Sequence, residues 1–245
     1  MPRVFHKVEL IRYTERPEEA VALAAKLCYS DSDIEGLREE LSKKDTTAFI
    51  KKLVDMGHLS PIEHACFTFA IEGVSRALLA QITRHRIASF SVKSQRYVRA
   101  KGGFNYIIPP AIEALGEDAV KQFEQQMDTI YSFYKGWLER LEKGERGNED
   151  ARFVLPNAAE SKMIVTMNAR ELLHFFSLRC CNRAQWEIRA VAWDMLRLVT
   201  EVAPALFSTA GPSCVRVKCG EGKMSCGLME EVRRRHAELT SNCGA

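Results

Sequence analysis

One segment of the sequence gathers side chains suited to binding an anion. Between Gly73 and Ile112 there is no aspartate or glutamate, yet seven basic residues lie there: Arg76, Arg84, Arg86, Lys93, Arg96, Arg99 and Lys101. Planar guanidinium groups bind phosphate oxygens through paired hydrogen bonds, and an uncompensated positive field attracts anions. The segment therefore predicts a ligand that carries phosphate groups; the alternative is a solvated basic surface without a ligand.

The most specific part of this segment is the string RHRIASFSVKSQRY, which runs from Arg84 to Tyr97. Two arginines flank His85 where a predicted helix ends, and a loop with hydroxyl side chains and a third arginine follows. Arg84 and Arg86 are too close in sequence to share a helix face, so we expect them to contact different groups. The Ser94 hydroxyl and the loop amides can complete a phosphate site.

Familiar nucleotide-binding and hydrolase motifs do not occur in the sequence. There is no GxGxxG after a predicted strand, no GxxxxGK[ST], no HExxH and no GxSxG. The pair Gly102-Gly103 predicts a turn. A nucleotide bound by this chain must therefore be held by side chains.

The elements that position these residues alternate irregularly between strands and helices. Apolar periodicity and capping residues predict strands at 8–13, 65–73 and 160–168, and helices at 17–30, 46–56, 76–86, 118–143, 169–178 and 188–202. The polar segment 144–150 is predicted to be a loop. Without a βαβ rhythm, an internal repeat or a linker, the pattern predicts one α+β domain over residues 1–245, with a mixed or antiparallel sheet and long packing helices.

The longest predicted helix carries an apolar stripe with alternating spacings of three and four residues. Its members are Val120, Phe123, Met127, Ile130, Tyr134, Trp137 and Leu141. A heptad-like stripe of this kind requires a partner helix, in the same subunit or in another one.

Composition places the chain among globular proteins. Of its 245 residues, 46% are hydrophobic and 27% charged, which excludes disordered, collagen-like and coiled-coil classes. No apolar run approaches the ~18 residues of a membrane span, and the charged N-terminus does not resemble a secretory signal. These features predict a cytoplasmic protein.

The sequence contains eight cysteines, which in a reducing compartment are expected to be free thiols. Four of them lie in a cysteine-rich C-terminal tail at about 210–245: Cys214, Cys219, Cys226 and Cys243. Their spacings do not match the usual zinc knuckle pairs. Mobile free thiols and no metal site are therefore expected, with structural zinc as the alternative.

The ordered string resembles the signature of a known family, the flavin-dependent thymidylate synthases. In that family RHR is followed by seven residues and a serine, as in Arg84-His85-Arg86…Ser94. Further segments that resemble the family occur in the family's order at 57–64 (GHLSPIEH), 151–156 (ARFVLP), 168–170 (NAR) and 178–188 (LRCCNRAQWEI).

The resemblance implies the reductive methylation of dUMP to dTMP in nucleotide biosynthesis. Methylenetetrahydrofolate is then the carbon donor, and FAD reduced by NADPH is the hydride source. It also implies a homotetramer whose active sites are shared between subunits, without nucleic acid or membrane as a partner. All of these ligands are anionic, in agreement with the basic segment.

The family's ligand contacts can be carried over to matching positions. The resemblance implies FAD contacts at His58, Ser60, Glu63, Arg84, His85, Arg86, Asn168, Arg170 and His174. It implies dUMP contacts at Gln81, Arg84, Val92, Lys93, Ser94, Gln95, Arg96, Arg152 and Arg179. The chain departs from the family at two places: His174 stands where asparagine is common, and Ser91-Val92 where many relatives have Asn-Glu.

Arg179 is the residue to which the resemblance assigns catalysis. A guanidinium near O2 and N3 of uracil stabilises negative charge that develops when the ring accepts a hydride. Cys180 and Cys181 lie beside it and suggest a nucleophile, but nothing adjacent supplies a base, so we interpret them as packing residues. Ser94 is likewise expected to bind phosphate instead of attacking the ring.

Two other functions are compatible with parts of the sequence. A nucleic-acid-binding protein would use the basic segment as a phosphate track, but it would need aromatic stacking positions and a net charge above +3. A flavoprotein with a different acceptor is the second alternative, and turnover of dUMP distinguishes it.

Overall fold

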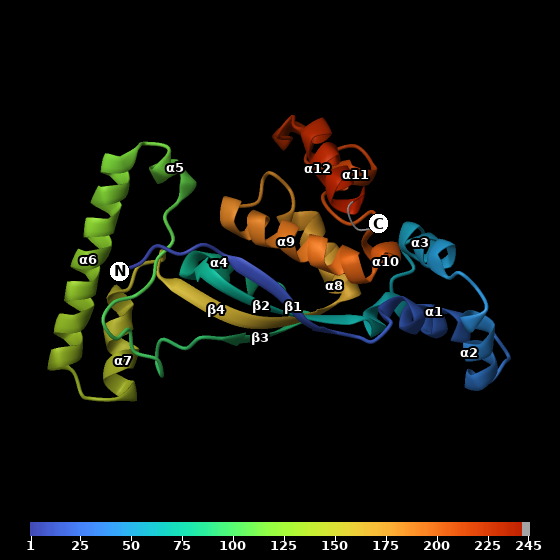
Figure 1. The fold of residues 1–245 in the computed structure, drawn as a ribbon, viewed down its shortest axis with the longest axis horizontal. Coiled ribbons are helices and arrows are strands. Elements are labelled where there is room, and N and C mark those ends of the chain that lie inside the picture. Colours follow the sequence, from blue (N-terminus) through green and yellow to red (C-terminus); the bar gives the residue numbers. More distant parts are fainter. Residues whose placement is uncertain (242–245) are drawn as a thin grey trace. The chain divides into compact units, whose positions relative to one another are not determined.

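Four segments with alternating exposure pair into one sheet. In the computed structural model, which describes residues 1–241, these are β1 (Lys7–Tyr13), β2 (Cys66–Ser75), β3 (Ala88–Val92) and β4 (Glu160–Asn168), in the order β1-β2-β4-β3 (Figure 1). The residue after β1, Thr14, donates its N–H to Cys66 at the start of β2 at 2.9 Å, and Lys93 after β3 donates to Lys162 near the start of β4 at 2.9 Å. The end of one strand thus faces the start of the next, so these pairs are antiparallel. The predicted α+β class is confirmed.

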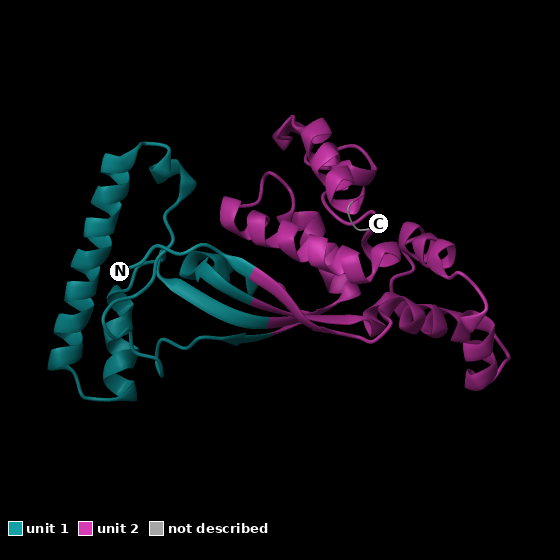
Figure 2. Ribbon diagram, in the orientation of Figure 1, with its two compact units in different colours: residues 1–7, 71–84, 90–164 teal, residues 8–70, 85–89, 165–245 magenta. Residues whose placement is uncertain are grey.

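The chain divides into two compact units (Figure 2). Unit 1 consists of residues 1–7, 71–84 and 90–164, and unit 2 of the remaining described residues, 8–70, 85–89 and 165–241. Four of the five boundaries fall inside strands, one each in β1, β2, β3 and β4, so every strand of the sheet contributes residues to both units.

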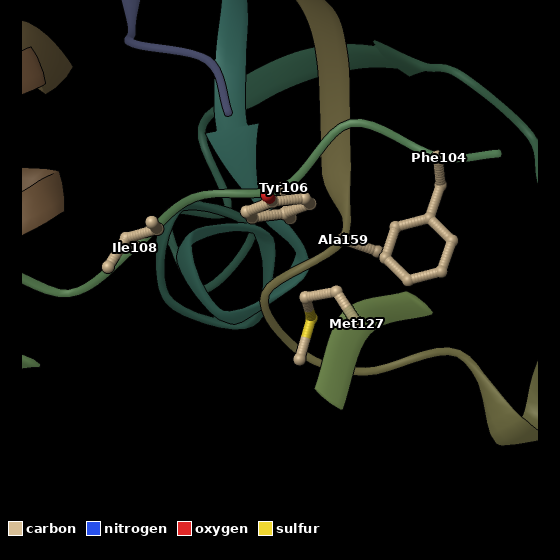
Figure 3. Close-up of a cluster of buried hydrophobic side chains, with 5 residues drawn as sticks. All are labelled: Phe104, Tyr106, Ile108, Met127 and Ala159. Atoms are coloured by element: carbon tan, nitrogen blue, oxygen red, sulfur yellow. The ribbon is translucent and has the colours of Figure 1, made fainter. Parts of the chain in front are cut away.

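Unit 1 is built around a long amphipathic helix. Its helices are α4 (Arg76–Ile82), α5 (Pro110–Glu113), α6 (Glu117–Arg140), α7 (Glu145–Ala151) and the 3-10 turn η2 (Arg152–Val154). Figure 3 shows the buried cluster of this unit, which consists of Phe104, Tyr106, Ile108, Met127 and Ala159.

The predicted apolar stripe of α6 packs onto this cluster. Met127 and Tyr134 are buried, and Val120, Phe123 and Ile130 pack against the cluster. The partner of the stripe is therefore largely the extended segment 104–108 of the same chain and not a long helix. Trp137 keeps 46% of its surface exposed.

A glycine in β2 allows two backbone segments of unit 1 to approach closely. Gly73 has φ +66°, and a Cβ atom at this position would lie 2.0 Å from the carbonyl oxygen of Phe5. Only a residue without a side chain fits both the left-handed conformation and this approach.

Unit 2 has a core rich in phenylalanine. Its helical elements are α1 (Pro17–Leu27), α2 (Ile34–Ser42), α3 (Thr47–Asp55), η1 (Pro61–His64), α8 (Ala169–Arg179), α9 (Trp186–Val202), α10 (Pro204–Phe207), α11 (Ser213–Arg216), η3 (Gly222–Met224) and α12 (Met229–Ser241). Phe67 and Phe176 both pack edge-on against Phe207, with ring centroids 5.4 and 6.1 Å away. Such edge-to-face pairs stabilise the core beyond the burial of their area.

Several predicted boundaries and loops were wrong. Residues 88–92, expected to be loop, form β3, and 145–151 form α7. The helix predicted at 76–86 ends at Ile82, and the hydroxyl of Thr83 donates to the carbonyl of Leu79 at 2.7 Å. Helix α2 was not predicted. The C-terminal tail contains α11, η3 and α12.

Within residues 1–241, every helix is too short or too polar to cross a membrane.

Candidate functional site

The residues implied to contact FAD and those implied to contact dUMP lie largely in different units. The residues expected to contact FAD lie in unit 2, apart from Arg84 at the end of a unit 1 segment. The residues expected to contact dUMP lie in unit 1, apart from Arg179.

His85 is the centre of a buried hydrogen-bond network in unit 2. Only 5% of the residue is exposed. Its Nδ1 lies 2.8 Å from Oε1 of Glu171, and Nε of Arg179 donates to its Nε2 at 3.1 Å. The structure thus brings together two residues that the sequence placed at the site, His85 and Arg179, and adds Glu171.

The protonation of His85 follows from these partners. A carboxylate only accepts and a guanidinium only donates, so the ring carries its proton on Nδ1 and presents a lone pair at Nε2. Burial lowers the pKa of His85, the hydrogen bond to Glu171 opposes that shift, and the charge of Arg179 reinforces it. The imidazole is therefore neutral near neutral pH.

Helix α8 positions both partners of His85. Asn168 is its N-cap and accepts from the backbone N–H of Glu171 at 2.9 Å. The position of Glu171 in the first turn suits a carboxylate because the helix dipole is positive there. Arg179 is the last residue of the helix, two turns away on the same face.

Other implied flavin contacts offer exposed polar groups. Arg170 and Glu63 form an ion pair at 2.5 Å, and their side chains are 52% and 45% exposed. Ser60 precedes η1 without a capping bond from its side chain. The rings of His58 and His174 lie beside Tyr29 and His85, at 6.3 and 5.8 Å between centroids.

The loop expected to bind the dUMP phosphate is held by its own side chains. The hydroxyl oxygen of Ser94 accepts from the backbone N–H groups of Arg96 and Tyr97, at 3.2 and 3.4 Å. Arg96 pairs with Glu145 at 2.5 Å and with Glu149 at 3.0 Å, both on α7. Acids from a distant part of the sequence therefore balance part of the acid-free segment, which local composition could not reveal.

A small cavity adjoins the same loop. It measures about 240 Å³, and the residues that line it include Lys93, Gln95, Arg99, Lys101 and Glu160. Val92 ends β3 immediately before this loop.

Two guanidinium groups of unit 1, those of Arg76 and Arg152, interact electrostatically. Burial, and after it the charge of Arg152, lowers the pKa of Arg76. Arg152 was an expected dUMP contact, whereas Arg76 was counted in the basic segment without a role. Neighbouring like charges are suited to an anion between them. On α4, the amide of Gln81 donates to the carbonyl of Ala77 at 3.3 Å, and Arg84 is exposed.

The cysteines were tested as alternatives to Arg179 and as metal ligands. Cys180 is fully buried, and burial raises the pKa of its thiol well above the ordinary value; this supports a packing role. Burial and the neighbouring Cys219 raise the pKa of Cys214. Among residues 1–241, no group of three or more histidine, cysteine or acidic side chains is arranged to hold a metal ion, and Cys243 lies outside the described residues.

Comparison with known proteins gives consistent matches over most of the chain. The family model described as "Thymidylate synthase complementing protein" matches residues 9–205. A flavin-dependent thymidylate synthase of Geobacter sulfurreducens is 53% identical over 96% of this chain and 99% of its own length. The Clostridium tetani enzyme of the same name is 48% identical over 93% and 96%.

A solved structure is similar as well. It is the UMP/dUMP methylase PolB from Streptomyces cacaoi bound with 5-Br dUMP, with a TM-score of 0.69 and 25% identity over 84% of this chain and 94% of that one.

Proposed function

Since the chain belongs to the family of flavin-dependent thymidylate synthases, we propose that it catalyses the reductive methylation of dUMP to dTMP. The observation that carries the proposal is the hydrogen bond from Arg179 to the buried, neutral His85. It holds a permanent positive charge at the end of α8, where a pyrimidine ring can be polarised. The similar PolB structure, described as bound with a brominated dUMP, supports this class of substrate.

The residues of unit 2 fit FAD. The pyrophosphate of such a cofactor requires cations and hydroxyl donors, and Arg86, Arg170 and Ser60 are all exposed. Imidazole faces suit stacking on flat rings, as at His58 and His174. The full set proposed for FAD is His58, Ser60, Glu63, Arg84, His85, Arg86, Asn168, Arg170 and His174. When bound and reduced, FAD supplies the hydride.

The ion pair between Arg170 and Glu63 is expected to orient the guanidinium for its ligand. A carboxylate that holds one edge of a guanidinium leaves its other N–H groups directed away from that edge. Half of the Arg170 side chain is exposed, so the group can contact an anion while the pair remains formed.

For dUMP, the chain supplies charge at the two ends of the molecule. The phosphate is assigned to Arg84, Lys93, Ser94, Gln95, Arg96 and Arg152. Gln81 and the backbone of Val92 complete the contacts. At the pyrimidine, Arg179 stabilises the negative charge that develops on the ring. It acts as a fixed charge and moves no proton.

Arg96 already contacts two carboxylates of α7 through Nε and one terminal nitrogen, so it would bind phosphate with its remaining N–H groups or by exchanging a carboxylate for the phosphate. A phosphate dianion competes well with a carboxylate for a guanidinium.

Methylenetetrahydrofolate as carbon donor, NADPH as reductant and a homotetramer with shared sites complete the proposal. Several large apolar side chains are exposed in the described chain, among them Phe153 at 82% and Leu115 at 77%, as expected for surfaces that another subunit covers. Light scattering of the flavin-bound protein tests the assembly, and a monomer with intact activity would contradict it.

The activity is tested with the purified protein, dUMP, methylenetetrahydrofolate and NADPH. We expect flavin absorbance that NADPH bleaches, followed by dTMP that depends on all three substrates. A flavoprotein that is bleached but leaves dUMP unchanged under these conditions would have a different acceptor. A colourless protein that retains nucleic acid would support the alternative of a nucleic-acid-binding protein.

A further inference from the structure

One face of α8 carries both partners of His85. Glu171, Phe175 and Arg179 follow one another at intervals of four residues, so they lie on the same side of the helix. The ends of this row are separated by about 12 Å along the helix axis, at ~1.5 Å per residue. The ring of His85 packs edge-on against Phe175, 4.9 Å between centroids, and contacts Glu171 and Arg179 at its two nitrogens.

The network permits only one arrangement of protons. Glu171 accepts, so the proton of the imidazole is on Nδ1; Arg179 donates, so Nε2 must be without one. If Glu171 did not fix this tautomer, a proton on Nε2 would face the Nε–H of Arg179, and the hydrogen bond between the two side chains would be lost. The side chain at position 171 therefore determines whether Arg179 can donate its hydrogen bond to His85, although residue 171 is not part of that hydrogen bond.

The hydrogen bond between Arg179 and His85 fixes the orientation of the guanidinium plane. A guanidinium is planar, so a hydrogen bond from Nε–H restricts the directions in which the terminal NH2 groups point.

A glutamate at the buried position 171 is unfavourable for folding by itself. The residue is only 6% exposed, and burial of a carboxylate disfavours folding unless it is paired. An apolar residue would fill the same space at lower cost.

On these grounds we propose that Glu171 and His85 are positioning residues that set the plane of the Arg179 guanidinium against the uracil ring of dUMP. The proposal rests on the proposed function, because it takes dUMP as the substrate that Arg179 contacts.

Glu171→Gln tests the proposal because its amide either donates to Nδ1 or accepts from it, and so no longer fixes the tautomer. Glu18→Gln is the matched control. Glu18 also lies in the first turn of a helix of unit 2 and is partly buried, but it accepts from the backbone N–H of Ala205.

In Glu171→Gln we expect dUMP-dependent reoxidation of the reduced flavin to slow by about 10–100-fold, the range found for hydrogen-bond partners behind metal-bound histidines. Reduction by NADPH should be unchanged, and Glu18→Gln should match the wild type in both reactions. Equal rates of reoxidation in Glu171→Gln and the wild type would overturn the proposal.

A double-mutant cycle separates positioning from a general structural effect. If Glu171 acts through Arg179, then Glu171→Gln should not slow dUMP-dependent reoxidation any further in a protein from which Arg179→Ala has already removed the guanidinium. Full additivity of the two losses would show that Glu171 acts by another route.

A pair of variants at His85 keeps the proposal testable if Glu171→Gln does not fold. His85→Gln retains one donor and one acceptor without the ring, whereas His85→Phe retains a ring without either. We expect dUMP-dependent reoxidation of the flavin to be faster in His85→Gln than in His85→Phe. A faster reaction in His85→Phe would mean that the ring matters and the hydrogen bonds do not.

Affinity for dUMP distinguishes failure of this proposal from failure of the proposed function. Calorimetry should show weaker dUMP binding in Glu171→Gln than in Glu18→Gln and the wild type. Absence of dTMP from the wild type would reject the proposed reaction, while the affinities would still decide whether Glu171 positions Arg179.

Discussion

At the scale of single residues, we propose that Arg179 stabilises charge on the pyrimidine ring and that Ser94 binds the substrate's phosphate. The first is held by a neutral imidazole, and the second accepts two backbone N–H groups of its own loop. Among the described residues, neither contact pairs a nucleophile with a general base, so we propose that both residues act through charge and hydrogen bonds. Their substitution should have different effects.

Replacement of Arg179 by alanine should act mainly on the chemical step. Loss of one preorganised donor to developing charge typically lowers a rate by about 100–1000-fold. The variant should remain yellow and should be bleached by NADPH, since the residues proposed for FAD are intact. Arg179→Lys should recover little, because an ammonium group lacks the planar fork. Near-normal dTMP formation by Arg179→Ala, measured by product analysis, would contradict this role.

Ser94→Ala should weaken dUMP binding and leave turnover detectable at saturating dUMP. A hydrogen bond to a charged group contributes ~1.5–3 kcal/mol, which corresponds to about 10–100-fold in Kd. Ser91→Ala, at an exposed position of β3, is the control and should bind dUMP normally. A covalent adduct on Ser94, found by mass spectrometry, would identify it as a nucleophile instead.

At the scale of elements, strands β1, β2 and β4 and most of the longer helices could be predicted, whereas the short strand β3, the short helices and α12 could not. The strand at 160–168 has the predicted bounds, because its alternation of buried and exposed residues extends from end to end. Segment 144–150 looked like a loop from its polar composition, yet Asn148 is buried and binds Arg99 and the carbonyl of Arg96. Contacts with a distant segment stabilise α7, so local sequence does not indicate it.

In the candidate site, too, a residue positioned by a contact with a distant segment was not indicated by the local sequence. Arg179 and His85 were found because their motifs resemble a family. Glu171 has no such signal: an acidic residue three positions after the cap Asn168 is typical of an ordinary capping box. Its carboxylate instead reaches a histidine 86 positions away in the sequence.

Gly73→Ala should destabilise the protein strongly for its size. The new Cβ would meet the carbonyl of Phe5, a backbone atom that cannot move aside, and the positive φ adds about 1–3 kcal/mol of strain. Gly136→Ala is the matched control: it lies inside α6 with open space around it and should stabilise by roughly 0.5–1 kcal/mol. Thermal unfolding of both variants measures the difference. A Tm in Gly73→Ala equal to that of the wild type would contradict the close approach.

Helix α12 should respond to acid through His236. The residue is 8% exposed, and its Nε2 is buried with no hydrogen-bond partner among the described residues. Burial lowers its pKa below the ordinary 6.5, against the effect of a hydrogen bond with the backbone of Ala210. On acidification, the unfolded chain binds a proton at His236 at a higher pH than the native protein does. The contribution of this residue to the free energy of unfolding is therefore complete above about pH 6.5 and is lost as the pH falls through the lower native pKa.

His236→Phe removes this titration and keeps a ring of similar size. Between about pH 8 and pH 5.5, chosen to bracket an ordinary histidine, the Tm of the wild type should fall further than that of the variant. His85 is present in both proteins and cancels in the comparison. Parallel losses of Tm would show that His236 is not a source of acid sensitivity.

At the scale of the whole molecule, the proposed ligand contacts divide along the boundary of the two units. The FAD residues belong to unit 2 with the exception of Arg84, and the dUMP residues to unit 1 with the exception of Arg179. Arg84 and His85 are consecutive residues on opposite sides of that boundary. Of the RHR string, Arg84 belongs to both sets, whereas His85 and Arg86 belong to the FAD set alone.

We propose that the bound flavin and dUMP take part in one reaction. The most direct test of this proposal is anaerobic: the flavin is reduced, and its absorbance is followed after dUMP and methylenetetrahydrofolate are added, singly and together. We expect the oxidised spectrum to return fully only when both are present, with dTMP formed in proportion to the flavin that is reoxidised. A flavin that stays reduced with both substrates present, or reoxidises without forming dTMP, would contradict it.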